Sequence, residues 1–213
     1  MTIAAAPAAP REPAGNVTGL IDYARFRQAE SLDKEHLLAW GKQTLVTDAP
    51  GPIPSLPLPP MLMFDRITRI EHAGRRGLIV AEQDIHLDAW YFLCHFGNDP
   101  VQPGCLGVDA IWQLLGMYCA LRGGLGAGRA LGCKEVDFFG QIRPHDRVVT
   151  YRVEVRRYSE MQGASVVIGD GSVSVDGEAI YTVRDAKVGI FPGIQYADYP
   201  ARSANSKGGV LNK

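Results

Sequence analysis

Hydrophobic positions are most concentrated between Gly104 and Leu121, where apolar side chains occupy nearly the whole circumference of the expected α-helix. This pattern is typical of a helix that is buried on most sides, not of one that lies on a surface. Only Asp109 and Gln113 are polar in the middle of the segment. Because they are four residues apart, we expect their side chains to share one face of the helix.

Runs rich in β-branched and aromatic residues predict strands on both sides of this helix. Two are expected before it and three or four after it, at residues 61–70, 77–85, 130–139, 148–158, 164–175 and 179–191. Asp176-Gly177 predicts a hairpin between the last two runs. An antiparallel sheet wrapped around one long helix is the economical way to bury that helix, so the sequence predicts an α+β fold. Pairing of sheet edges into a dimer would add to the burial.

The length of 213 residues predicts one domain with a tail at each end. Residues 1–30 are expected to form a disordered or loosely ordered arm, since Met1–Gly19 is rich in alanine and proline. Residues 31–192 are expected to form the domain, and residues 193–213 a C-terminal tail. Six prolines between Pro50 and Pro60 argue against regular structure there.

Charge and composition exclude several classes of partner. The formal net charge of -1 gives no field that would attract nucleic acid. No segment approaches the ~18 consecutive apolar residues of a membrane span, and the start of the chain lacks the features of a secretory signal, which predicts a cytoplasmic protein. The cysteines are too irregularly spaced for a disulfide framework and are expected to be free thiols: Cys94, Cys105, Cys119 and Cys133.

The candidate chemistry lies on the two sides of a Pro103-Gly104 turn, with His95 before it and Asp109 after it. A carboxylate on a buried helix is costly unless it is paired, hydrogen-bonded or protonated, so Asp109 is a candidate proton donor. The alternative is a structural aspartate, but Asp109 lies too far inside the helix to be its N-cap. Taken alone, a histidine such as His95 is more often a core residue with one backbone partner. Together the two residues predict an acid–base pair.

Three other interpretations of this region are weaker. Cys94, His95 and Cys105 lack the spacing of zinc ligands and have no evident fourth partner, so no metal site is expected. A Cys94 nucleophile activated by His95 is disfavoured because neighbouring residues of a strand point to opposite faces. The glycine-rich run at 123–128 precedes a strand instead of opening a helix, which indicates a connector and not a phosphate loop.

Several motifs resemble the bacterial β-hydroxydecanoyl-acyl-carrier-protein dehydratase/isomerase family. The resemblance covers about residues 31–192 and rests on Met61-Leu62-Met63-Phe64-Asp65-Arg66, on residues 90–96, on Asp99-Pro100-Val101, on residues 103–110, on Trp112-Gln113-Leu114, and on residues 128–132, 149–152 and 185–189.

The resemblance implies a hot-dog fold and a homodimer with active sites at the interface, His95 coming from one subunit and Asp109 from the other. Related dehydratases that do not isomerise usually carry Glu at the carboxylate position, so Asp109 favours the dehydratase/isomerase branch. The family usually reads Phe-Ile-Gly-Asp-Pro-Val-Met-Pro-Gly, and this chain departs from that pattern at Gly97, Asn98 and Gln102. These departures bear on chain-length preference and on isomerase activity.

Dehydration of a 3-hydroxyacyl thioester needs a base for the C2 proton, here His95, and an acid for the departing hydroxyl, here protonated Asp109. Free N–H groups at the helix start, that of Gly104 first, can stabilise the enolate oxygen. In the family, the carbonyl matching Val101 orients the histidine. The same His95 could move the double bond to C3–C4, and no cofactor is needed. The other expected substrate-binding residues are Cys94, Cys105 and Gln113.

The family's substrates imply an acyl carrier protein as partner, with Arg156, Arg157 and Lys187 near the tunnel mouth as docking charges. They could also be ordinary solvated side chains. Three classes of function remain open. The first is a dehydratase with isomerase activity on medium, C10-like chains, in unsaturated fatty acid synthesis. The second is a dehydratase alone, of fatty acid, polyketide or polyunsaturated-lipid synthesis. The third is a hot-dog thioesterase or acyl-binding protein.

Overall fold

The structure, a computed structural model, describes residues 21–161 and 163–194. Most of the expected arm and nearly all of the expected C-terminal tail lie outside these residues. The described elements, in chain order, are α1 (Tyr23–Arg27), α2 (Lys34–Gly41), β1 (Arg66–Ala73), β2 (Arg76–Asp84), α3 (Gly104–Leu121), β3 (Ala127–Gly132), β4 (Glu135–Phe138), β5 (Val148–Met161), β6 (Ala164–Val175) and β7 (Glu178–Phe191).

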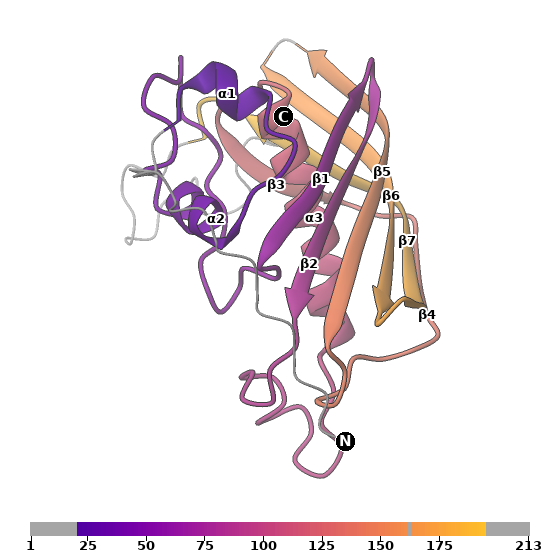
Figure 1. The fold of residues 1–213 in the computed structure, drawn as a ribbon. Helices are drawn as coiled ribbons and strands as arrows, with labels where there is room; N and C mark the ends of the chain where they lie inside the picture. Colours follow the sequence, from indigo (N-terminus) through magenta and orange to yellow (C-terminus); the bar gives the residue numbers. More distant parts are fainter. Residues whose placement is uncertain (1–20, 162, 195–213) are drawn as a thin grey trace, which may run out of the picture.

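Seven antiparallel strands form one sheet in the order β1-β2-β5-β6-β7-β3, and β4 also pairs with β7. Figure 1 shows α3 running along one face of this curved sheet, with α1 and α2 beside β1. Along β5, alternate residues from Val149 to Val155 are buried. This is the hot-dog fold, and it confirms the prediction of an antiparallel sheet wrapped around one buried helix.

Helix α3 is the centre of the core, with thirteen of its 18 residues buried. Glycines let the sheet approach it closely. A Cβ atom at Gly171 would lie 2.7 Å from the Ile111 side chain, and one at Gly169 would lie 3.1 Å from that of Leu115. Contrary to the expectation from sequence, α3 has the length and apolar composition of a membrane-spanning helix, but 72% of it is buried inside the fold.

Two predicted strands differ from the observed ones. The first begins at Arg66, because the chain before it passes α3, where the main chain at Met61 and Met63 bonds to the Gln113 side chain. The predicted strand 130–139 begins earlier, at Ala127, and is divided into β3 and β4 after Gly132, whose φ of 124° interrupts an extended chain. The hairpin at Asp176-Gly177 is confirmed, with both residues at positive φ.

The fold begins before the predicted boundary at residue 31. Asp22 caps α1, and Phe26 of that helix is fully buried against Trp40, with ring centroids 4.8 Å apart. Arg27 donates a 2.9 Å hydrogen bond to the carbonyl of Arg122, at the end of α3. Residues 21–30 therefore belong to the domain because they cover one end of its core helix.

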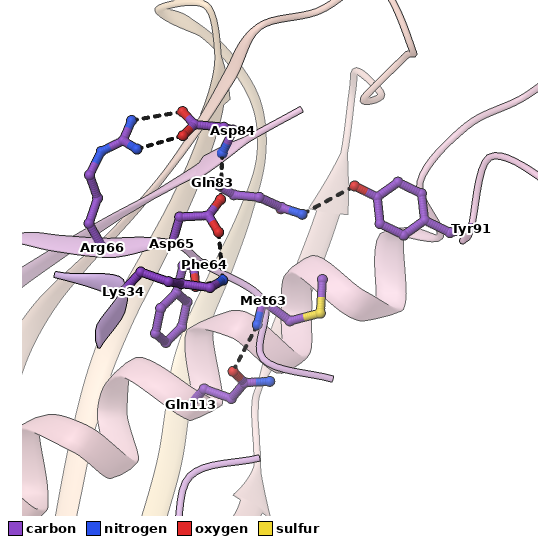
Figure 2. A network of polar contacts seen from close by, with 9 residues as sticks. All are labelled: Lys34, Met63, Phe64, Asp65, Arg66, Gln83, Asp84, Tyr91 and Gln113. Atoms are coloured by element: carbon purple, nitrogen blue, oxygen red, sulfur yellow. Dashed lines mark hydrogen bonds and ion pairs between the residues drawn. The ribbon is translucent and has the colours of Figure 1, made fainter. Parts of the chain in front are cut away.

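Ion pairs fasten the beginning of β1 to its surroundings (Figure 2). Lys34 Nζ lies 2.6 Å from Asp65 Oδ1, which ties α2 to the sheet. The Arg66 guanidinium donates to both carboxylate oxygens of Asp84 on β2 and holds the pKa of that carboxyl below its usual value. These contacts hold the end of β2, which contains Gln83 and is followed by the long loop before α3.

Candidate active site

His95 lies in the loop between β2 and α3, not on a strand, and main-chain bonds hold it in place. Its N–H donates to the Tyr91 carbonyl, and its own carbonyl accepts from the Val101 N–H, each at 2.8 Å. Its Nδ1 lies 3.1 Å from the Val101 carbonyl oxygen. Since a carbonyl only accepts, Nδ1 carries the ring proton and Nε2 keeps a free lone pair. Of the two ring nitrogens, Nε2 is therefore the one that could accept a proton from a bound molecule.

A cavity of about 320 Å³ opens beside this imidazole. Its lining includes His95, Val101, Gln102, Gly104, Cys105 and Tyr181. No side chain caps the N-terminus of α3, and among the described residues the N–H groups of Gly104 and Cys105 donate no hydrogen bond. These free donors and the helix dipole favour a negatively charged oxygen here. A Cβ at Gly104 would lie 2.6 Å from the Phe138 ring, so a larger residue here would displace that side chain.

Asp109 is half-buried, and Gln113 holds its carboxylate. The Gln113 Nε2 donates to Asp109 Oδ2 at 2.6 Å and to the Met61 carbonyl at 2.8 Å. Its Oε1 accepts from the Met63 N–H at 3.3 Å (Figure 2). The expected shared face of the helix is therefore observed. Asp109 Oδ1 accepts no hydrogen bond within the described part of the chain, so it is the oxygen available to carry a proton.

Within one chain, the two predicted catalytic residues line different cavities. Asp109 borders a space of about 260 Å³ with Trp40, Leu56 and Trp112, on the side of α3 toward α2. His95 borders the other cavity. After Gly104, four residues of α3 are not fully buried: Cys105, Asp109, Trp112 and Gly116. Their spacing of four, three and four residues forms one stripe along the helix, so the carboxylate lies on the open face of the subunit.

The structure gives Cys94 and Cys105 different places. Cys94 is exposed in a turn, where its Sγ lies 3.4 Å from the Trp90 carbonyl. The argument from strand alternation against a Cys94–His95 pair was therefore wrong in its premise. Cys105 is exposed at the start of α3 and lines the His95 cavity. No cluster of three or more His, Cys, Asp or Glu side chains suited to a metal occurs among the described residues.

Of the three departures from the family pattern, Gly97 and Asn98 are exposed, whereas Gln102 is buried and lines the His95 cavity. Sequence reasoning missed Tyr181, Phe138 and Gln83. Alternation along β7 could have indicated that Tyr181 points inward. No local pattern indicates that Phe138 covers Gly104 or that Gln83 reaches Gln102.

The three predicted docking cations are not equivalent. Arg156 makes ion pairs with Asp170, at 3.1 Å, and with Asp185, so two carboxylates already compensate its charge. This compensation was not expected from the sequence. Arg157 and Lys187 are exposed, and both are in register with Ile168 of the strand between them. They therefore lie on one face of the sheet.

Comparison with known proteins agrees with this architecture. The model of the FabA-like domain matches residues 56–184, and the chain belongs to this family. Solved structures with a similar fold include the dehydratase heterocomplex ApeI:P from Xenorhabdus doucetiae, at 12% identity and a TM-score of 0.45, covering 64% of this chain and 86% of that one. The PaaI protein of E. coli is 17% identical with a TM-score of 0.39, covering 56% and 81%. A hypothetical thioesterase of Streptococcus pneumoniae is 16% identical with a TM-score of 0.39, covering 58% and 83%.

Proposed function

We propose that this protein dehydrates 3-hydroxyacyl thioesters and that its active site forms between two copies of the chain, with His95 from one and Asp109 from the other. The trans-2-enoyl product is then isomerised to the cis-3-enoyl thioester. The substrate has a medium, C10-like acyl chain carried by an acyl carrier protein, in unsaturated fatty acid synthesis in the cytoplasm.

The placement of Asp109 carries the proposal. Gln113 orients its carboxylate, yet within one chain this carboxylate borders a different cavity from His95 and lies on the open stripe of α3. Large apolar side chains are also exposed at and next to the β3–β4 edge: Leu131, Phe138 and Phe139 are 42%, 53% and 61% exposed. An exposed apolar edge beside an open helix face favours burial against a second copy.

In the proposed reaction, His95 Nε2 removes the C2 proton of the substrate. The electron pair of that C–H bond forms the C2–C3 double bond, and the C3–O bond breaks. Asp109 Oδ1 gives its proton to the departing hydroxide, which leaves as water. The thioester oxygen gains negative charge during this step, and the N–H groups of Gly104 and Cys105 stabilise it. Each proton transfer contributes a factor of ~10²–10⁴.

Isomerisation needs removal of a proton from C4 and return of a proton to C2. Once His95 has released the proton that it took during dehydration, its one lone pair can carry out both transfers, since C2 and C4 are both bonded to C3. The proton state of the enzyme is unchanged by this reaction, whereas dehydration moves one proton from Asp109 to the leaving water and one from C2 to His95.

Incubation of the purified protein with 3-hydroxydecanoyl N-acetylcysteamine thioester tests the proposal. We expect loss of water, followed by appearance of the cis-3-decenoyl product, as separated by chromatography and identified by mass. Formation of the trans-2-enoyl thioester without the cis-3 isomer would restrict the function to dehydration. Release of free thiol and acid would instead indicate a thioesterase.

Two variants assign the roles. His95→Ala should abolish dehydration, and Asp109→Asn should do nearly the same, because an amide of the same shape cannot deliver the proton. Wild-type turnover by a folded Asp109→Asn protein would exclude Asp109 as the acid.

A further inference from the structure

Trp40 of α2 borders two cavities and is the one described residue that lines both. One is the cavity of about 260 Å³ that Asp109 also borders. The other, of about 210 Å³, is lined further by residues between Gln43 and Ile53, in the segment that follows α2. The Trp40 side chain therefore forms the partition between the two cavities.

Two contacts hold this indole in place. Its Nε1 donates a 2.7 Å hydrogen bond to the Pro54 carbonyl, and the Phe26 ring packs edge-on against it at a centroid distance of 4.8 Å. Pro54 lines the Asp109 cavity, whereas Ile53, directly before it, lines the other. The hydrogen bond thus anchors the indole where the chain passes from one cavity to the next. Trp40 is a fixed wall there, since turning its buried ring would leave the N–H and the carbonyl unpaired.

The Asp109 cavity suits the tail of the proposed substrate. Asp109 is the proposed acid at C3, so the carbons from C4 onward begin beside its carboxylate. Three side chains that line the cavity are apolar, those of Leu56, Trp112 and Val188. Gly116 also lines it and lies on the same stripe of α3, about 10 Å farther along the helix axis. The cavity is therefore an apolar space that extends along α3 from the position of the reacting carbon.

We propose that the acyl tail of the substrate lies in the Asp109 cavity and that Trp40, by closing this cavity toward the second one, sets the longest chain that the protein accepts. A longer chain would have to displace a buried, hydrogen-bonded indole. Trp40 does not act on the reacting atoms, so it is a residue that determines specificity. The inference rests on the proposed function, because that function places C3 of the substrate at Asp109.

The affinity of saturated acyl chains tests this wall separately from the reaction, since the proposed chemistry cannot consume them. The protein is titrated in a calorimeter with N-acetylcysteamine thioesters from hexanoyl to tetradecanoyl. Affinity should rise about tenfold for each two carbons that enter the cavity. In the wild-type protein the rise should stop at the decanoyl chain, where the tail meets Trp40.

Two variants should move this limit in opposite directions. Trp40→Leu joins the two cavities, so the dodecanoyl thioester should bind about tenfold more tightly than the decanoyl one. Gly116→Leu fills the Asp109 cavity from the helix side, so the rise should stop at the octanoyl chain. A Cβ at Gly116 would lie 3.8 Å from Val188, so this position has room for a side chain. Leu37→Ala is the matched control, because Leu37 is a buried residue of α2 that lines neither cavity. It should keep the wild-type limit.

The same limit in the wild-type and Trp40→Leu proteins would overturn the inference, as would an affinity that does not depend on chain length. If Trp40→Leu does not fold, Gly116→Leu decides, and an unchanged limit in that variant would place the acyl tail elsewhere. If the limit moves as expected but wild-type protein dehydrates no 3-hydroxyacyl thioester, the proposed function fails and the role of Trp40 stands. Dehydration with an unmoved limit would retain the function and refute the wall.

Discussion

At the scale of single residues, the site depends on main-chain and side-chain groups that hold its two titratable side chains in place. Val101 fixes the imidazole of His95 through its carbonyl, and Gln113 fixes the carboxylate of Asp109 through its amide. Gln113 also bonds the crossing segment at Met61 and Met63, so all its polar atoms are used. Through this amide, Gln113 determines where the proposed proton donor lies.

Replacement of this amide tests that role. Gln113→Met is expected to lower kcat at least tenfold with little change in KM, because the substrate still binds while the acid is misplaced. It should also lower the free energy of unfolding by about 1–3 kcal/mol, since the Met61 carbonyl and the Met63 N–H lose their partner. Steady-state kinetics and urea unfolding measure the two effects. A variant with reduced stability and wild-type kcat would show that Gln113 is structural only.

At the scale of elements, close approach between α3 and the sheet is set by glycines that differ in their surroundings. A Cβ at Gly107 would collide with the Tyr181 hydroxyl, whereas one at Gly116 would lie 3.8 Å from Val188, an ordinary contact. Both glycines lie inside α3, where alanine is the better helix former by about 1 kcal/mol. The same substitution should therefore have opposite effects at the two positions.

We expect Gly107→Ala to lower the free energy of unfolding by roughly 1–3 kcal/mol, because overpacking outweighs the gain in helix propensity. Gly116→Ala should be neutral or should stabilise by up to ~1 kcal/mol. Chemical denaturation of the two proteins measures this difference. Equal stability of the two variants would contradict the packing described for Tyr181.

Helices, strands and turns could be predicted from the sequence where a short stretch of residues determines them by itself. The apolar circumference of α3 and the Asp176-Gly177 turn indicate structure without reference to the rest of the chain. The strand was predicted to begin at 61 because residues 61–64 are apolar, but Leu62, Met63 and Phe64 are buried in the core without belonging to a strand. The Asp109–Gln113 contact follows from helical spacing, whereas the Gln83–Gln102 bond joins residues whose proximity only the folded chain determines.

At the scale of the whole molecule, the faces of the subunit differ in what they can bind. The open stripe of α3 and the apolar β3–β4 edge favour a second copy of the chain. The opposite face of the sheet carries Arg157 and Lys187, which remain candidates for docking an acidic carrier protein, whereas Arg156 is paired with Asp170 and Asp185.

Arg157→Glu combined with Lys187→Glu should lower kcat/KM for carrier-bound substrate steeply at low salt, and less at high salt, because exposed charges act mainly on association. The N-acetylcysteamine thioester of the same acid should be almost unaffected. Arg147→Glu, at a side chain that is 86% exposed just before β5, is the charge-reversal control. Equal losses on both substrates would mean that the two cations support the fold or the tunnel.

The measurement that most directly tests the central claim is the activity of a mixed dimer. His95→Ala and Asp109→Asn chains are expressed together with different affinity tags, and the dimer that carries both tags is purified. If His95 and Asp109 act across the interface, one of its two sites contains both native residues, so it should show about half of the wild-type dehydratase activity while each variant alone is inactive. A mixed dimer as inactive as the two parents would contradict the account, because it would place both residues of each site in the same subunit.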